Sequence, residues 1–299
     1  MTTVHAIAKS SLLERVIATL DVFPLSRAEV IRSVMSLTAS LDAGTRELAD
    51  AISADPALTG KVLRLSNSPF YGRIRQVASL DQAIMILGFQ TIRSLVVATS
   101  TATMFKSGKD KDLQDDLWRH SLAVAVASRI IAQRHNASLV EEAFITGLMH
   151  DIAKPVLLQR FPDEYKPVIA AIRDGARDEL EVESELLGFT HAELCVRILE
   201  HWNFPPEVTR AAGRHHDYDG LTLIGADIAI APKEIALSRI VCFADELAKS
   251  NGYTFAGRPA ADLNSMAVTE HLGLTDEAIG QISESLDETY HETEVYFQS

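Results

Sequence analysis

Apolar residues recur every three or four positions through most of the chain, the pattern of amphipathic helices. In the first third, Ser26 and Ser79 each open a capping box, and Thr45 is a further candidate cap. Asp55-Pro56 places a cap residue before a proline that suits a first helical turn, and Gly88 fits a helix stop. A strong alternating pattern of the kind that marks strands is not found here. We therefore predict an all-α fold.

A histidine and an aspartate, His150 and Asp151, stand side by side at the end of a predicted helix. The capping box Ser138–Glu141 starts this helix, and Pro155 is expected to end the helical run. Both side chains are costly to bury unless they are hydrogen-bonded, paired or bound to metal. Adjacent residues point in different directions on a helix. They can therefore reach one metal, or two neighbouring metals, only near a helix end or a distortion.

Other predicted helices also carry polar residues that could join this pair. In chain order these residues are His120, His191, His215, His216 and Asp245. His120 lies in an apolar stripe, where a lone histidine is more often a satisfied core side chain than a ligand. His191 falls in the first turn of the helix that Thr190–Glu193 caps, and the helix opened by Pro205-Pro206 is expected to run on to 214–217. Asp245 lies among apolar residues of the helix 233–249 and needs a partner.

The net charge of −13 is unevenly spread along the chain. Residues 1–110 hold 12 Lys and Arg against 9 Asp and Glu, whereas residues 111–299 hold 16 against 32. The acidic part should repel nucleic acid and attract divalent cations. We expect an N-terminal helical part over 1–110, a polar linker over 106–116, a second helical domain over 111–284 and a flexible acidic tail over 285–299.

Composition and length favour a cytoplasmic protein. The 299 residues can bury a substantial core. We find no apolar run of the roughly 18–20 residues that a membrane span needs, and no secretory signal pattern. Cys195 and Cys242 lie in apolar helical segments and are interpreted as reduced core residues.

A series of short motifs in the first third resembles the HDOD family, the HD-related output domains of bacterial signalling proteins. The motifs are Asp55-Pro56-Ala57-Leu58, Val62-Leu63-Arg64-Leu65 with Asn67-Ser68, Ser79-Leu80, Ala83-Ile84 and Leu87-Gly88. We interpret Asn67-Ser68 as a turn whose side chains satisfy local backbone groups, in preference to a catalytic pair. Lys61, Arg64, Arg73 and Arg75 form either a patch for an anionic ligand or, as we favour, a solvated surface.

The ordered histidines and aspartates are similar to the metal-ligand set of the HD superfamily of phosphohydrolases, above all to its HD-GYP branch. The resemblance implies a divalent metal site, with one ion or two, built by His120, His150, Asp151, His191, His215, His216 and Asp245. It implies that Asp151 binds or bridges metal and that Lys154 contacts phosphate or assists proton transfer. Two departures stand out: Leu221-Thr222-Leu223 replaces the Gly-Tyr-Pro extension, and Ala153 replaces a glycine.

Three functions follow from these observations. The first is a signalling module with a metal site, which binds a partner protein or a small nucleotide ligand. The second is a metal-dependent phosphohydrolase that acts on a nucleotide or a cyclic dinucleotide, with Asp151 and Lys154 as catalytic residues. Imidazoles and carboxylates suit Fe, Mn or Zn, and Mg is a further candidate. The third, nucleic-acid binding, is least favoured because of the acidic charge. A buried hydrogen-bonded network inherited from an enzyme is the alternative to a metal site.

Overall fold

Helices carry the fold throughout the residues that the computed structural model describes, which are 12–20, 25–40, 43–71, 77–105, 110–173, 177–216 and 231–297. The predicted all-α class is confirmed, since these residues contain no strand. The helices are α2 (Leu25–Ala39), α3 (Thr45–Ser53), α4 (Pro56–Ser66), α5 (Leu80–Phe105), α6 (Lys111–His135), α7 (Val140–Met149), α8 (Ala153–Arg160), α9 (Pro162–Ile172), α10 (Glu179–Leu186), α11 (His191–His201), α12 (Pro206–Ala212), α13 (Pro232–Ser250), α14 (Ala267–His271) and α15 (Asp276–Glu294). Short 3-10 turns are η1 (Pro69–Tyr71), η2 (Ala137–Leu139) and η3 (Leu263–Ser265).

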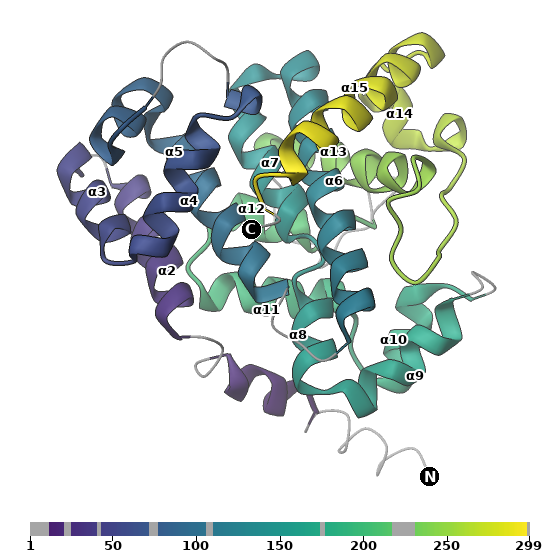
Figure 1. The fold of residues 1–299 in the computed structure, drawn as a ribbon. Helices are drawn as coiled ribbons and strands as arrows, with labels where there is room; N and C mark the ends of the chain where they lie inside the picture. Colours follow the sequence, from purple (N-terminus) through teal and green to yellow (C-terminus); the bar gives the residue numbers. More distant parts are fainter. Residues whose placement is uncertain are drawn as a thin grey trace.

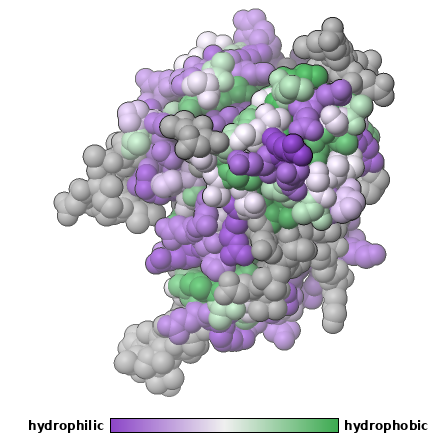
Figure 2. Space-filling model, turned by 90° about the vertical axis from the view of Figure 1, so that its left-hand side faces the viewer, coloured by the Kyte–Doolittle hydropathy of each residue, from purple (hydrophilic) through white to green (hydrophobic). Residues whose placement is uncertain are grey.

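The N-terminal helices pack around α5 on the left of Figure 1. Helices α2, α3 and α4 each contact α5, and they bury apolar side chains such as Ile31, Ile52 and Val62. The surface on this side of the molecule is mostly hydrophilic, with smaller apolar areas between the polar residues (Figure 2). Burial of one stripe on each helix stabilises this part.

The remaining helices surround α6, α7 and α13, which are in mutual contact. Helix α12 packs against α7 and α13, and α11 packs against α12 and α8 (Figure 1). Gly147 allows α7 to lie close to α6, since a Cβ atom there would be 2.6 Å from Ser128 Oγ and 2.8 Å from the Val124 carbonyl oxygen. This close packing fixes the end of α7, where His150 and Asp151 follow.

Helix α5 is interrupted at Gly88 and then resumes. Gly88 has φ of 82° and ψ of 164°, a conformation that residues with a side chain rarely adopt. The predicted stop is therefore a break in the helix, and the chain continues as a helix to Phe105. Within the described residues, α5 is the one helix long and apolar enough to cross a membrane. Within its most apolar stretch of 18 residues, 61% is buried inside the protein, so we describe α5 as a core helix.

Of the six predicted caps, three form and two do not, and the side chain of the sixth, Ser26, is outside the described part of the structure. Asp55 accepts from the backbone of Ala57 and Leu58, Ser79 accepts from the backbone of Gln82, and Thr190 and Glu193 form a complete capping box. Thr45 is instead the first residue of α3, after an N-cap at Gly44. Asn136, not Ser138, caps the turn before α7, because its carboxamide accepts from the Ser138 backbone.

Other predicted boundaries also shift. Pro155 does not end a helix, because it lies in the first turn of α8, where its missing N–H breaks no helical bond. The predicted linker over 106–116 is too long, because α6 begins at Lys111; residues 106–109 lie outside the described residues. The predicted flexible tail is wrong as far as residue 297. Ile282, Leu286 and Tyr290 recur at four-residue spacing and are buried, and this apolar stripe keeps α15 helical to Glu294.

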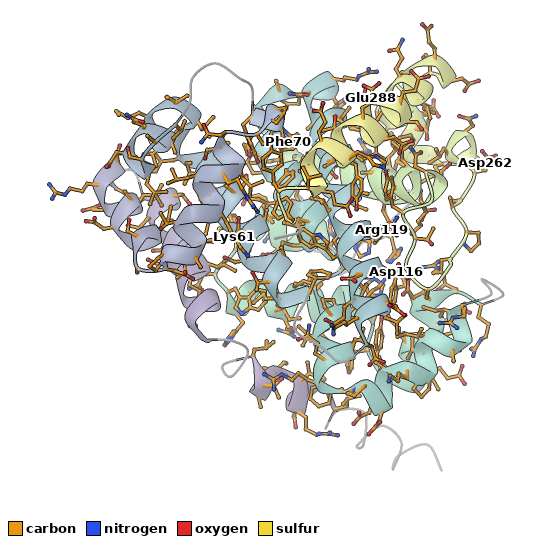
Figure 3. The ribbon with its side chains drawn as sticks, in the orientation of Figure 1. Lys61, Phe70, Asp116, Arg119, Asp262 and Glu288 are labelled. Carbon is orange, nitrogen blue, oxygen red and sulfur yellow. The ribbon has the colours of Figure 1, made fainter. Side chains whose placement is uncertain are left out.

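The Asn67-Ser68 motif forms a turn, as predicted, but only Asn67 satisfies backbone groups, since Ser68 Oγ is buried without a hydrogen-bond partner among the described residues. The Asn67 amide donates to the carbonyls of Leu63 and Val77, and its oxygen accepts from the Val77 backbone. Phe70 follows in η1 (Figure 3). The centroid of its ring lies 5.8 Å from that of the Phe144 ring in α7. This motif therefore joins the N-terminal helices to α7. Of the predicted basic patch, Arg64 donates to the Tyr296 carbonyl, whereas Arg73 and Arg75 lie outside the described residues.

Candidate metal centre

The His150-Asp151 pair lies in the turn between α7 and α8. Helix α7 ends at Met149, and α8 begins at Ala153. The expected distortion is therefore present, and it lets the two adjacent side chains face the same interior region. Both side chains are at most 1% exposed, so they need partners.

The other predicted ligands come from four further places in the fold. His120 lies in the middle of α6, His191 is the first residue of α11, and Asp245 lies in α13. His215 and His216 follow the end of α12 at Ala212, so the helix is shorter than predicted. Residues 217–223, with the departure from the Gly-Tyr-Pro pattern, lie outside the described residues.

The predicted ligands converge, and two of the groups of three that they form share no member, while a third group, His150 with Asp151 and His215, overlaps both. We call the two separate groups the first triad, His120 with His150 and Asp245, and the second triad, His191 with His215 and His216. In the first triad, His120 Nε2 is 3.2 Å from Asp245 Oδ1. In the second, His191 Nε2 is 3.2 Å from His215 Nε2 and 3.0 Å from His216 Nε2. Within each triad, ligand atoms lie within 4.8 Å of one another, which is close enough to share an ion.

Asp151 stands between the two triads. Its Oδ2 is 3.6 Å from His120 Nε2 and 3.4 Å from His150 Nε2. Its Oδ1 is 3.3 Å from His191 Nε2 and 3.7 Å from His215 Nε2. One carboxylate oxygen thus faces each triad, so Asp151 is placed to contribute a ligand atom to both.

In three of the histidines, the hydrogen-bond partner of Nδ1 determines which ring atom faces Asp151 and its neighbours. The Nδ1 atoms of His120, His150 and His215 lie 2.6–2.8 Å from the carbonyl oxygens of Tyr253, Gly147 and Ala212. A carbonyl only accepts, so Nδ1 carries the hydrogen. In a neutral ring, Nε2 then presents a lone pair toward the carboxylates. Metal-binding histidines are usually oriented in this way, by a hydrogen bond from the ring nitrogen that does not bind the metal.

Acceptor atoms therefore face one another in a buried space. Among the described residues, His150 Nε2, Asp151 Oδ1 and Asp245 Oδ1 are buried without a hydrogen-bond partner. A proton, a metal ion or a hydrogen-bond-donating water between them would relieve this arrangement. Burial and the neighbouring histidines hold the pKa of His215 and of His216 well below the usual range, so these two rings are neutral near pH 7. Imidazole and carboxylate donors fit iron, manganese or zinc.

Two lysines balance the carboxylates of the centre. Lys154 Nζ is 2.9 Å from Asp151 Oδ2, and Lys249 Nζ is 2.7 Å from Asp245 Oδ2. Burial disfavours the charged form of Asp151, but Lys154 and then His150 outweigh it and hold its pKa well below the usual value. Burial likewise opposes the charge on Lys154, but Asp151 and Glu179 raise its pKa, so the amine stays protonated.

Sequence reasoning missed several residues around the centre. Glu179 accepts from Lys154 and Arg258, Glu183 from His191, and Glu246 from Lys249 and the backbone of Ala261. The four-residue spacing of Asp245 and Lys249 could have signalled an ion pair on one helix face. The acids of α10 alternate with other residues in the sequence and resemble a solvated face, so Glu179 and Glu183 gave no usable signal.

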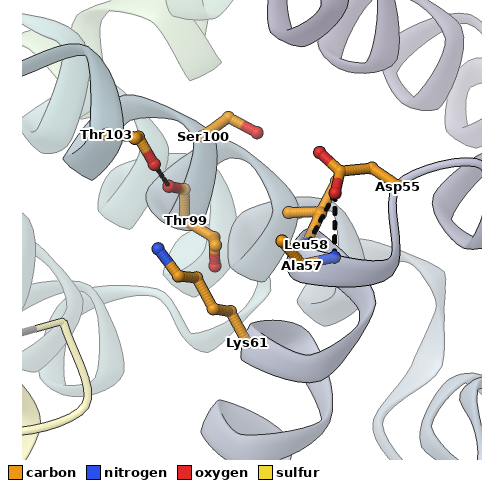
Figure 4. A pocket seen from close by; sticks show the side chains of 7 residues that line it. All are labelled: Asp55, Ala57, Leu58, Lys61, Thr99, Ser100 and Thr103. Carbon is orange, nitrogen blue, oxygen red and sulfur yellow. Dashed lines mark hydrogen bonds between the residues drawn. The ribbon is translucent and has the colours of Figure 1, made fainter. Parts of the chain in front are cut away.

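Two cavities lie away from this centre. One, between α4 and α5, has a volume of about 20 Å³ and is lined by Asp55, Lys61 and Ser100 among others (Figure 4). That volume holds about one water molecule. The other, about 600 Å³, is lined by residues of α3, α4 and the start of α5, including Arg46, Asp50 and Asp81. Neither borders the two triads.

Comparison with known proteins agrees with the fold. A protein of Treponema pallidum (strain Nichols), itself uncharacterised, is 23% identical over 179 residues. The match covers 59% of this chain but only 34% of that longer protein. An HDOD domain protein of unknown function from Geobacter sulfurreducens has a similar structure, with a TM-score of 0.73 and 24% identity over 91% of this chain and 92% of its own.

A second solved structure, described as a candidate phosphohydrolase from Shewanella amazonensis SB2B, has a TM-score of 0.69 and 24% identity. The likeness covers 94% of this chain and 97% of that one. At these identities the structures show a shared fold. The sequence model of the HDOD domain family matches residues 25–218 of this chain. These residues include the Asn67 turn, the His150-Asp151 pair and the second triad. This chain belongs to the HDOD domain family.

Proposed function

We propose that this chain is a regulatory HDOD protein whose two triads bind a pair of divalent metal ions. The observation that carries the proposal is the position of Asp151, with one oxygen toward each triad and lone pairs facing it from both. A carboxylate placed between a set of two histidines with an aspartate and a set of three histidines would suit two neighbouring cations. Lys154 and Lys249 keep the carboxylates ionised and oriented.

A signalling role is supported by the family and by the contact between the two halves of the chain. The Phe70 ring packs on Phe144 of α7, and Arg129 of α6 lies over the rings of Phe70 and Tyr71. A movement of α7 would therefore disturb its contact with Phe70 and, through it, the N-terminal helices. The recognised molecule would be a partner protein or a small nucleotide.

A phosphohydrolase is the second candidate. A metal pair that shares a carboxylate can stabilise both the attacking and the leaving oxygen when a phosphoryl group is displaced. The Shewanella amazonensis protein of similar fold is described as a candidate for this activity. Lys154 would act as a fixed positive charge toward phosphate. Its raised pKa argues against the proton-accepting role. Lys154 is only 4% exposed and is paired with Asp151 and Glu179. Both ion pairs would have to break before its amine could reach a substrate.

The test is elemental analysis and metal titration of the purified protein, followed by turnover assays on nucleotides and cyclic dinucleotides. We expect two equivalents of divalent metal in the wild type and at least a hundredfold weaker uptake in Asp151→Asn, which keeps the side-chain shape. A wild type that takes up no metal would contradict the proposal. Turnover that depends on Asp151 and metal would favour the enzyme over the purely regulatory protein.

A further inference from the structure

Within the centre, His191 differs from His120, His150 and His215 in the partner of its Nδ1 atom. Its Nδ1 lies 2.6 Å from Glu183 Oε2, so its partner is a carboxylate and not a main-chain carbonyl. The same oxygen accepts the backbone N–H of His191 at 2.7 Å. Both side chains are fully buried. One carboxylate oxygen of Glu183 therefore holds both the ring and the main chain of His191.

A buried carboxylate behind an imidazole changes what the ring offers on its other side. It selects the form with hydrogen on Nδ1, and it makes Nε2 a stronger donor to a cation than a carbonyl partner does. His191 Nε2 is the atom that lies 3.3 Å from Asp151 Oδ1 and 3.0 Å from His216 Nε2. Glu183 therefore acts on the second triad.

The first triad is supported in the opposite way. Its carboxylate, Asp245, is bonded by the Lys249 ammonium, which draws charge away from the ligand oxygens. The His120 and His150 rings are backed by neutral carbonyls. A negative group supports one position and a positive group restrains the other, so the two positions should differ in affinity.

We propose that Glu183 is a positioning residue that sets the metal affinity of the position at the second triad. The metal affinity at the first triad depends instead on Asp245 and Lys249. This inference rests on the proposed metal pair. It adds that the two positions are unequal and names the residue responsible for one of them.

The experiment is a titration of the full chain with Co²⁺, followed by absorption spectroscopy and by competition with a chelator. The variant is Glu183→Gln, which keeps the volume and an acceptor oxygen but removes the charge. Glu181→Gln, the same change at an exposed position of α10, is the matched control. The unfolding midpoint of each protein is measured first.

We expect Glu183→Gln to bind one equivalent of Co²⁺ 10–100-fold more weakly, while the other equivalent changes by less than about twofold. Equal weakening of both equivalents, or none, would overturn the inference. A wild type without Co²⁺ uptake would instead overturn the proposed function.

A second readout uses the metal-free protein. The His191 Nδ1 hydrogen should resonate far downfield in the wild type and move upfield in Glu183→Gln, because the bond loses its charge. If Glu183→Gln does not fold, this resonance in the wild type still tests the bond, and its absence from the downfield region overturns the inference.

Discussion

The two halves of the molecule each place a polar motif at a helix end, and the two motifs behave differently. At the end of α4, the Asn67 side chain makes three hydrogen bonds with main-chain groups of Leu63 and Val77. At the end of α7, Asp151 and His150 direct acceptor atoms toward other acceptors. The Asn67 side chain has its partners within the turn, whereas the acceptor atoms His150 Nε2 and Asp151 Oδ1 lack theirs among the described residues, which supports the proposed cation site.

The largest effect in this comparison should come from supplying that cation. A ligand that binds only the folded state at a thousand times its Kd stabilises it by about 4 kcal/mol. We expect divalent metal to raise the free energy of unfolding by about that amount, as measured by denaturant titration with metal and with chelator. Asp151→Asn should show little difference between the two conditions. Equal stability of the wild type in both would contradict the distinction between the halves.

A smaller effect is expected from Gly147→Ala in α7. The added methyl group would meet Ser128 Oγ and the Val124 carbonyl closer than van der Waals contact allows. Overpacking of this kind costs about 1–3 kcal/mol. Chemical unfolding should show a loss in this range, and cobalt binding should report whether the displaced α7 also disturbs His150.

Gly60→Ala is the matched control in the N-terminal half. Gly60 lies inside α4, and a Cβ atom there meets nothing within 4 Å. Alanine favours a helix over glycine by up to about 1 kcal/mol, so this variant should be more stable than the wild type. The same substitution in two helices should therefore shift stability in opposite directions. A loss at both positions would show that contacts of α4 are tighter than the structure indicates.

The smallest effect should follow Asn67→Ala. Loss of its bonds to Leu63 and Val77 should lower the free energy of unfolding by about 1 kcal/mol, since each hydrogen bond contributes modestly. Metal uptake should be unchanged, because Asn67 serves only the turn. A large fall in metal affinity with unchanged stability would instead point to a functional role for the motif.

Sequence patterns predicted the helical class because apolar spacing is encoded locally, and the candidate ligands followed from the resemblance to the HD superfamily. Apolar spacing marks a helix face, and Thr190 with Glu193 marks a helix start wherever the helix lies. The structure brings all seven predicted ligand residues into one region, although whether they bind metal stays a prediction. The domain boundary near residue 110 also stays a prediction.

The surroundings of the centre could not be predicted, because they depend on packing between distant segments. Glu183 reaches His191 from a different helix, and Arg258 reaches Glu179 from a loop about eighty positions away. Ser138 failed as a cap because Asn136 competes for the same turn. The tail was misjudged because its net charge hides the buried stripe that ends with Tyr290.

Asp151, with one oxygen toward each triad, also has a thermodynamic consequence. Two ions that share a ligand are linked, so whatever factor the first ion applies to the affinity of the second, the second applies to the first. In the proposed metal pair, an ion at one triad would orient the carboxylate for the other, while the two positive charges would repel. The balance of these terms would determine whether the centre fills gradually or over a narrow range of metal concentration.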